Sequence, residues 1–441
     1  MTDIVKYLKN HLSVILIVVL AIIPLFIWLF MMPISFRFSS SGTTFRSLGQ
    51  ITGLLGMALM SINFILGARF KFLDELFNGL NRVYIKHHLI GGISFCLILF
   101  HPVFLIIQYL LISLKASFDF ILAFQNWPVL LGEIALLIFI ILLFITFYLK
   151  FKYQNWKISH QYLGIVLFLS GLHMFFVPSD ISNNTILKYY MLGLFILGAY
   201  SFFYRTIFRV YKKEEYKYKL EEVKKVNDNI AELRLSPLSK KLEFLPGQFV
   251  FLRFENKNIL SESHPFSITS STEDEELLLS IKILGDYTSM IYLLKPGAIC
   301  NIEGPFGAFS YLKANSKRQI WVAGGIGITP FLSMARELNL NKMSNNDYVV
   351  DLYHVVNNST EAVFVNELME ISKNNANFKF HQYFSDDSGR ISADFIFQNS
   401  QNIKDAEIFL CGPVGFMKSL RDQFVKLGFI KSKIYSEEFS L

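Results

Sequence analysis

The sequence predicts a multidomain protein in which an all-α membrane domain of six helices precedes an antiparallel β-barrel domain and an α/β domain. The chain of 441 residues is 52% hydrophobic and only 17% charged, and its mean hydropathy of +0.39 is too high for an ordinary soluble enzyme of this length. The apolar residues are concentrated in residues 12–210, whereas residues 212–441 alternate short apolar runs with polar residues and Gly. We therefore expect domains at residues 1–211, 212–313 and 314–441.

Six apolar segments in the first half approach the roughly 20 residues needed to cross a bilayer. They cover residues 12–32, 48–66, 88–111, 128–149, 161–177 and 186–204. The first is too long for a signal peptide, and no small-residue cleavage site follows it. The termini and the connections on their side hold thirteen Lys and Arg residues, and the opposite connections hold four. We therefore expect a multi-pass cell-membrane protein whose termini and soluble half are cytoplasmic.

The charge and the cysteines exclude several other classes of protein. The net charge of +7 requires no nucleic-acid partner, because much of it lies at the expected inner edge of the membrane. Cys96, Cys300 and Cys411 are far apart in the sequence, so neither a disulfide framework nor a zinc site is expected. No obligatory protein partner is evident.

Histidines lie near both ends of two expected spans, where a polar ring is costly unless it is bonded. His87 and His101 flank the third span, and His160 and His173 flank the fifth. The 14 residues from His87 to His101 correspond to roughly 21 Å along a helix, with the two side chains within about 40° of each other. A single such histidine would indicate a bond to a neighbouring helix, but two matched pairs favour axial ligation of two haems.

Two details leave the ligand set open. His88 is an alternative to His87, although His88 and His101 point about 140° apart on an ideal helix. His160 and His173 are 13 residues apart, the same spacing as His88 and His101. Joint ligation from that helix requires a tightened turn near Gly164 or Gly171, or a tilted helix.

The second half contains short strands and then alternating strands and helices. Residues 241–254 read as two strands around a turn, and HPFSITSS, SIKILGDYTSMI and IEGPFGAFSYL continue the pattern, so residues 214–312 are expected to form a small barrel. RQIWVAGGIGITPFLSMAREL reads as a buried strand, a glycine turn and a helix. The DYVVDLYHVV and AEIFLCGPVGFMKSL segments add two more strands. Glycines at such a turn allow the backbone to approach a phosphate at a helix N-terminus.

The order of these motifs resembles the ferredoxin-NADP reductase family, with HPFS on a flavin barrel, GGIGITP for the nicotinamide cofactor and CGP near the end of a Rossmann-like nucleotide domain. With the four-histidine half in front, residues 45–441 resemble the ferric reductase and NADPH oxidase superfamily. The resemblance implies a haem domain with two haem b groups, His87 and His160 ligating the inner one and His101 and His173 the outer one. It also implies FAD and NADPH or NADH as cofactors.

The resemblance further implies roles for residues of the soluble half. Ser267 would lie near the flavin N5, Cys411 beside the hydride path, and Phe439 on the isoalloxazine ring. The other residues expected to bind FAD or the dinucleotide are His264, Pro265, Phe266, Gly285, Tyr287, Thr288, Gly324, Gly325, Gly327, Thr329, Pro330, Gly412 and Pro413. Without the resemblance, Ser267 and Thr288 are ordinary turn hydroxyls, Cys411 is a small core residue, and Phe439 only packs the last strand.

The segment after YHVV departs from NADP-specific relatives, because Asn357, Asn358 and Ser359 provide no cation for a 2′-phosphate. We therefore expect less than about tenfold preference for NADPH over NADH. A calcium-binding loop is also lacking in the sequence, so calcium gating is not expected.

The function expected from these residues is electron transfer from cytoplasmic NAD(P)H through FAD and two haems to an acceptor on the outer face. Dioxygen, giving superoxide, is the first expectation for the acceptor, and a ferric or cupric chelate is the second. A membrane redox sensor or a transporter with a flavin reporter domain is the alternative from a different class.

Overall fold

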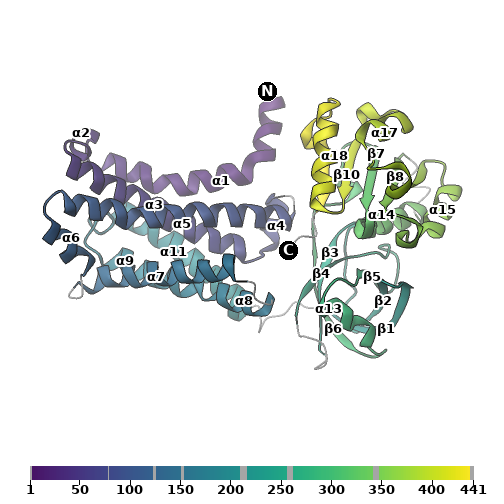
Figure 1. Ribbon diagram of the computed structural model, residues 1–441, viewed down its shortest axis with the longest axis horizontal. Helices are drawn as coiled ribbons and strands as arrows, with labels where there is room; N and C mark the ends of the chain where they lie inside the picture. The colour runs from purple at the N-terminus through teal and green to yellow at the C-terminus, as the bar shows by residue number, and fades with distance from the viewer. Residues whose placement is uncertain are drawn as a thin grey trace. The chain divides into compact units, whose positions relative to one another are not determined.

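The computed structural model describes residues 2–77, 79–122, 126–149, 153–208, 216–255, 262–340 and 347–437. The chain divides into two compact units, residues 1–213 and 214–441. The first unit is helical, and the second contains all of the strands of the described residues (Figure 1).

Six helical segments of the first unit are long and apolar enough to cross a membrane, which agrees with the predicted number. The long helices are α1 (Thr2–Phe30), α3 (Ser41–Gly67), α5 (Leu80–Leu110), α7 (Trp127–Tyr148), α8 (Tyr153–Gln161) with α9 (Leu163–Phe176), and α11 (Thr185–Phe203). The connections contain the short helices α2 (Ile34–Arg37), α4 (Lys71–Phe77), α6 (Leu114–Ile121) and α10 (Asp180–Asn183), which were not predicted.

Two helices begin well before the apolar segments predicted for them. Helix α3 begins at Ser41 rather than at residue 48, because the Ser40 side chain caps it by accepting a hydrogen bond from the Thr43 N–H at 3.2 Å. Helix α5 begins at Leu80 rather than at residue 88. Its first two turns mix Leu80, Val83 and Ile85 with polar residues, so a search for a continuous apolar run misses them although the backbone is helical.

The fifth span is interrupted at Tyr162, between α8 and α9. The Tyr162 N–H donates to the Ser159 carbonyl at 3.2 Å, and the Ile165 N–H donates to the Tyr162 carbonyl at 2.9 Å. Both bonds span three residues instead of four, so the chain is locally wound more tightly than an α-helix. This turn lies beside Gly164, one of the two positions that the sequence suggested.

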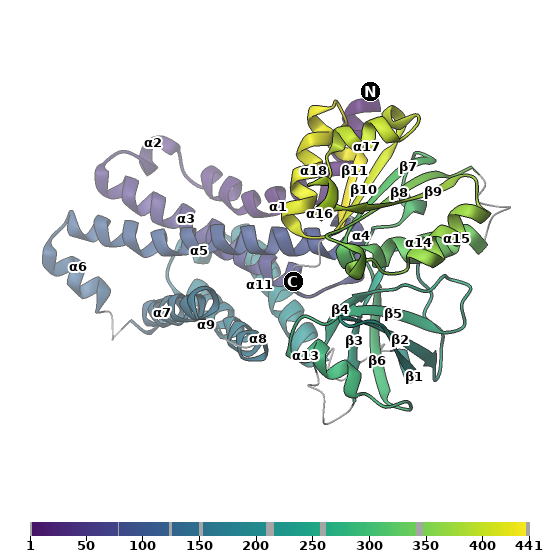
Figure 2. The same ribbon diagram turned by 45° about the vertical axis from the view of Figure 1, so that its right-hand side comes forward.

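Helices α3 and α5 lie side by side over most of their length (Figures 1 and 2). Glycines on α3 permit this approach, because an added Cβ at Gly56 would lie 2.7 Å from Ile98 Cγ1 and one at Gly49 would lie 2.8 Å from Leu105 Cδ2. The close packing brings the backbone of α3 next to the histidine-bearing face of α5.

The first sheet of the second unit is a curled antiparallel sheet with strand order β4-β3-β6-β1-β2-β5. Its strands are β1 (Tyr216–Asn227), β2 (Ile230–Pro237), β3 (Phe249–Phe254), β4 (His264–Ser267), β5 (Leu277–Lys282) and β6 (Ile299–Phe306). An isolated bridge between Ile268 and Leu279 brings the two edges of the sheet together. The concave side is filled by buried residues such as Leu220, Leu233 and Leu252.

Two short-strand predictions in this region were wrong. Residues 241–245 form no strand, because Pro246 cannot donate to a ladder and the Leu242 N–H is instead satisfied by the Tyr218 hydroxyl at 2.9 Å. The segment after Gly285 is the short helix α13 (Asp286–Ser289) rather than a strand. The Thr288 hydroxyl holds its first turn by accepting from the Gly285 N–H at 3.0 Å.

The second sheet is parallel, with strand order β11-β10-β7-β8-β9. Its strands are β7 (Arg318–Gly324), β8 (Val349–Val356), β9 (Phe378–Phe384), β10 (Glu407–Cys411) and β11 (Ile434–Glu437). Helices α14 (Thr329–Leu340) and α15 (Val365–Asn374) cover one face, and α17 (Ala393–Asn399) and α18 (Val414–Lys426) cover the other (Figure 2). The short helix α16 (Ser385–Ser388) follows β9. Trp321 and Val322, neighbours on β7, belong to opposite cores, as strand alternation requires.

Candidate functional site

The four predicted histidines form two pairs in the helical unit. The ring centroids of His87 and His160 are 6.0 Å apart, and those of His101 and His173 are 6.3 Å apart. We name them the 87/160 pair and the 101/173 pair. In each pair one ring comes from α5, and the other comes from α8 or α9.

The spacing of each pair fits a haem iron between the two rings. Two metal–nitrogen bonds of about 2 Å, and about 1 Å from each bonded nitrogen to its ring centroid, add up to about 6 Å. The described residues contain no group of three or more His, Cys, Asp or Glu side chains that would hold a bare metal ion. Two facing imidazoles instead suit a porphyrin, which supplies the other four ligands itself.

Backbone carbonyls orient three of the four rings, and the sequence did not indicate these partners. The Nδ1 atoms of His101 and His173 lie 2.7 Å from the carbonyl oxygens of Gly49 and Pro128, and His87 Nδ1 lies 3.1 Å from the Asn63 carbonyl. An Nδ1–H that donates to a carbonyl leaves Nε2 with its lone pair, which is the form that a metal needs.

Glycines make room for the rings of the 101/173 pair. An added Cβ at Gly53 would lie 2.7 Å from His101 Nδ1, and one at Gly132 would lie 2.7 Å from His173 Nδ1. Neither glycine was singled out in the sequence. The sequence does place a glycine on another span at the depth of each histidine. That signal can be interpreted only when it is known which helices pack against each other.

His87, rather than His88, belongs to the ring pair in this structure. The His88 side chain is exposed on α5, whereas the His87 ring faces His160. The tightened turn at Tyr162 changes the rotation between His160 and His173, which an unbroken helix with a spacing of 13 residues would point apart. Ligation by these four residues remains a prediction.

The glycine turns of the soluble unit face one cavity of about 840 Å³. Gly324 ends β7 and Gly325 and Gly327 follow it, while Gly412 and Pro413 follow the adjacent strand β10, and all five line the cavity. Strand β7 leads to α14 on one face of the sheet, and β10 leads to α18 on the other. Ligands of open parallel sheets bind at such a point, where helix N-termini favour phosphate.

The backbone in this cavity excludes side chains. An added Cβ at Gly327 would lie 2.3 Å from the Cys411 carbonyl oxygen, and Gly325 has a φ of +56°. Thr329 and Pro330 are buried at the start of α14, so they shape the turn rather than line the cavity.

Cys411 itself is fully buried in the core against α14. Burial and the neighbouring Glu437 raise the pKa of the Cys411 thiol well above its ordinary value, so the thiol is protonated at neutral pH. Glu437 is a buried carboxylate paired in register with Cys411, and the sequence did not single it out. Phe439 lies outside the described residues.

The predicted flavin residues cluster around β4. Ser267 is 5% exposed at the end of this strand, and the side chains of His264, Pro265 and Phe266 are partly exposed. His264 Nε2 lies 2.8 Å from Glu262 Oε2. Tyr287 is buried, with its ring centroid 4.0 Å from that of His264.

Family descriptions match three parts of the chain. Residues 52–171 match the ferric reductase like transmembrane component, residues 215–310 match an FAD-binding domain, and residues 321–422 match an oxidoreductase NAD-binding domain. These ranges contain the histidine pairs apart from His173, the β4 residues and the glycine turns, respectively.

The chain is also similar to curated proteins of known name. It is 28% identical over 231 residues to flavohemoprotein A of Dictyostelium discoideum, covering 48% of this chain and 57% of that protein. It is 28% identical over 305 residues to ferric reduction oxidase 5 of Arabidopsis thaliana, covering 67% and 40%. It is 26% identical over 323 residues to a heavy chain of the superoxide-generating NADPH oxidase of Dictyostelium discoideum, covering 66% and 42%.

The chain thus spans less than two thirds of the length of these relatives. A ferric-reductase-like membrane domain followed by FAD-binding and NAD-binding domains is nevertheless a specific combination in one chain. This combination shows that the chain belongs to the ferric reductase and NADPH oxidase superfamily.

Proposed function

We propose that this chain moves electrons from NAD(P)H, through FAD and two bis-histidine haems, to an acceptor on the other side of the membrane. The observation that carries the proposal is the pair of histidine sites at 6.0 and 6.3 Å, stacked along α5 in the same chain as a glycine-lined cavity. FAD, when bound, would accept a hydride and release single electrons, which is the form that haem iron accepts.

The residues of the soluble unit have distinct parts in this proposal. Ser267 would present its hydroxyl to the flavin N5, and Gly285 and Thr288 would lie against the flavin phosphates. Gly325, Gly327 and Gly412 line the cavity proposed for the dinucleotide. We place the curled sheet with FAD as a barrel domain at residues 212–313 and the Rossmann-like nucleotide domain at 314–441.

The acceptor is proposed to be dioxygen, giving superoxide. Iron with two histidine ligands has no vacant position, so we expect the acceptor to be reduced at the haem edge rather than on the iron. Similarity to a superoxide-generating oxidase supports dioxygen, and similarity to a ferric reduction oxidase supports a ferric or cupric chelate as the second candidate. The distribution of basic residues supports cytoplasmic termini and a cytoplasmic soluble unit.

The test is an acceptor comparison on the purified full chain in detergent. NAD(P)H oxidation is followed with and without oxygen, with a ferric chelate, and with a dye whose reduction is sensitive to superoxide dismutase. We expect a haem Soret band, anaerobic reduction of haem by NAD(P)H plus FAD, and oxygen-dependent superoxide. Haem that stays oxidised would instead favour a redox sensor or a transporter.

The proposed cavity also bears on the choice of donor. Asn357 and Glu361, which follow β8, line this cavity, and the Asn357 amide donates to the Glu361 carboxylate at 3.0 Å. Arg390 and Lys282 line the same cavity from other elements, and Lys282 was not anticipated. A carboxylate repels a 2′-phosphate and Arg390 attracts it, so we expect less than about tenfold preference for NADPH over NADH.

The ratio of kcat/KM for the two donors measures this preference directly. Arg390→Ala should lower the NADPH value and leave the NADH value nearly unchanged. A preference of a hundredfold or more for NADPH in the unmodified chain would contradict the prediction.

A further inference from the structure

One face of α14 is bonded to the loop that follows β4. Ser333, Arg336 and Glu337 are spaced as i, i+3 and i+4, so they lie on the same side of the helix. The Ser333 hydroxyl donates to the Ser270 carbonyl at 2.7 Å, and an Arg336 Nη1–H donates to the Thr269 carbonyl at 2.7 Å. These bonds join the parallel sheet's first helix to the curled sheet.

Glu337 completes the contact from the same face. Its carboxylate accepts from the Thr272 N–H at 2.8 Å and from the Thr272 hydroxyl at 2.9 Å. Glu337 is 6% exposed, and Thr269, Ser270 and Ser333 are fully buried. Hydrogen bonds to charged groups in such a dry environment are stronger than surface ones.

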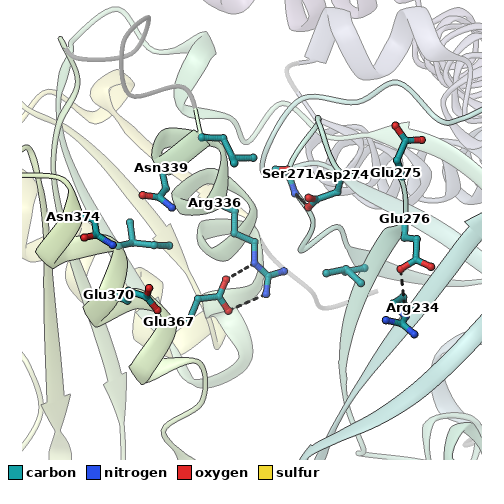
Figure 3. A pocket seen from close by; sticks show the side chains of 13 residues that line it. Arg234, Ser271, Asp274, Glu275, Glu276, Arg336, Asn339, Glu367, Glu370 and Asn374 are labelled. Carbon is teal, nitrogen blue, oxygen red and sulfur yellow. Dashed lines mark hydrogen bonds and ion pairs between the residues drawn. The ribbon is translucent and has the colours of Figure 1, made fainter.

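Arg336 is itself held from two directions. Its Nε and Nη2 atoms donate to the two oxygens of Glu367 on α15 at 2.6 and 2.9 Å, and Nη2 lies 3.8 Å from Glu232 on β2. Figure 3 shows the guanidinium with its two bonds to Glu367, and Arg234 paired with Glu276 on the curled-sheet side of the same pocket. The planar Arg336 guanidinium, bonded to Glu367 on α15 and to the Thr269 carbonyl of the loop, therefore connects these segments rigidly.

The loop is equally fixed to its own sheet. The Thr269 N–H donates to the Leu278 carbonyl at 2.9 Å, and the Ile268 N–H donates to the Gln248 carbonyl at 3.0 Å. Gly247, with a φ of +95°, lies so close to α14 that an added Cβ would be 2.2 Å from Met334 Cε. The bonds of the loop to α14, and the close contact of α14 with Gly247 in the turn before β3, restrict movement of α14 against the curled sheet.

The loop after β4 adjoins the proposed flavin site, and α14 adjoins the proposed dinucleotide site. Ser267, proposed to face the flavin N5, lies two residues before Thr269 in the chain. The glycine turn Gly325–Ile328, proposed to hold the dinucleotide, leads directly into α14 at Thr329. A shift of α14 against the loop therefore changes the separation of flavin and nicotinamide, and about 1 Å of misplacement costs on the order of a hundredfold in rate.

We propose that Ser333, Arg336 and Glu337 are positioning residues that set the distance and angle between the nicotinamide and the flavin for hydride transfer. The inference rests on the proposed function. It assigns to these three side chains an effect on the rate of flavin reduction and none on the affinity for either cofactor.

The experiment uses the full chain in detergent, loaded with FAD, in anaerobic stopped-flow reduction by saturating NADH or NADPH. Arg336→Met and Glu337→Ala should each slow bleaching of the flavin absorbance by about ten- to a hundredfold, with FAD occupancy unchanged. The apparent donor affinity should stay within about threefold, and a deuterated donor should give a larger isotope effect than in the unmodified chain. Glu337→Gln, which keeps an acceptor for the Thr272 N–H, should recover most of the rate.

Arg234→Met is the matched control, because it removes an arginine that lines the same pocket but pairs with Glu222 and Glu276 rather than with a residue of α14. It should reduce flavin at the normal rate. Rates within about twofold of the unmodified chain in both Arg336→Met and Glu337→Ala would overturn the proposal. Should these variants lose FAD, Ser333→Ala removes one hydrogen bond and carries the test with an expected decrease of about threefold; an unchanged rate there overturns the proposal equally.

Failure of the proposed function gives a different result. An unmodified, FAD-loaded chain that neither donor reduces would refute the electron-transfer proposal. Normal flavin reduction in the unmodified chain and in every variant would refute only the positioning role.

Discussion

The 87/160 pair and the 101/173 pair have nearly the same ring separation but different support. Both rings of the 101/173 pair are fixed by a carbonyl at 2.7 Å and lie against a glycine. In the 87/160 pair the His87 bond is 3.1 Å long, and His160 Nδ1 is buried with no hydrogen-bond partner among the described residues. The His160 ring stacks instead on Trp156, at 5.3 Å and 13°.

The difference shows that the distance between two rings and the orientation of each ring are set by different contacts. Carbonyl bonds fix the tautomer and the rotation of an imidazole before a metal binds, and they raise its basicity. Both rings of the 101/173 pair have such a carbonyl bond, whereas in the 87/160 pair only the His87 ring has one. We therefore expect the 101/173 site to hold its haem more tightly and to tolerate less change around the rings.

The largest expected effect comes from removing the rings themselves. Leu substitutions at His101 or His173 should abolish one haem, and Leu at His87 or His160 the other, so each variant should bind about half of the haem. Haem per protein, measured from the pyridine haemochrome, checks this. His88→Leu should retain both haems; if it loses one while His87→Leu keeps both, the pairing at this end is wrong.

The next effect distinguishes the two pairs through their glycines. Gly53→Ala and Gly132→Ala put a methyl group 2.7 Å from a ring nitrogen that is already hydrogen-bonded, so each should lower haem retention at the 101/173 pair. Gly67→Ala places its methyl 3.5 Å from His87, which is an ordinary contact, and should be tolerated.

Gly193→Ala controls for the substitution itself, since no atom of the described residues outside its own helix turn lies within 4 Å of the added Cβ on α11. Haem content and the Soret maximum of the four variants provide the measurement. Equal haem loss in Gly67→Ala and Gly53→Ala would show that the two pairs are supported alike.

The sequence revealed the histidines but not what holds them. The spacing of 14 residues from His87 to His101 is visible in one helix, so that pattern could be read directly. The 13-residue spacing of His160 and His173 indicated a tightened turn near Gly164 or Gly171, but it could not be placed at Tyr162, because nothing in the local sequence distinguishes three-residue from four-residue hydrogen bonds. The partners Gly49, Asn63 and Pro128 contribute only backbone carbonyls, which every residue possesses, so tertiary packing alone identifies them.

The soluble unit follows the same rule. The glycines around the cavity were predictable because a turn of this type admits few other residues. The contacts of Ser333 and Arg336 were not, because serine and arginine on a helix are usually solvent-facing residues, and their partners are again carbonyls of a distant loop.

His354 in the soluble unit is a buried histidine of the opposite kind. Its Nδ1 lies 3.1 Å from Gln382 Oε1, and its Nε2 lies 3.2 Å from the Gly325 carbonyl, so no position is left for a metal. Burial lowers the pKa of His354 from 6.5 to about 4. Between these values the unfolded chain binds the proton more readily than the folded one, so stability falls as the pH drops from 6.5 towards 4.

His354→Gln should remove this part of the pH dependence, at most about 3 kcal/mol in the free energy of unfolding. Unfolding of the full chain at pH 7 and pH 5, followed by flavin release, measures the difference between variant and unmodified protein. Haem content should be unchanged. An identical pH slope in both proteins would show that His354 titrates normally in the fold.

The smallest expected effect concerns Trp156, whose ring stacks on His160, the histidine of the 87/160 pair that lacks a carbonyl partner among the described residues. Aromatic stacking of this kind contributes about 0.5 to 1.5 kcal/mol. Trp156→Leu should therefore speed haem loss from the 87/160 pair by about two- to tenfold. Haem transfer to apomyoglobin resolves the two sites as two kinetic phases.

Trp127→Leu is the matched control, because Trp127 packs on Phe176 at 4.9 Å rather than on a histidine, and it should leave both phases unchanged. Faster loss from the 101/173 pair in Trp156→Leu, or no change in either phase, would mean that the tryptophan does not support His160. Among the described residues, His160 would then be held only by the turn at Tyr162, while His87 would keep its bond to the Asn63 carbonyl.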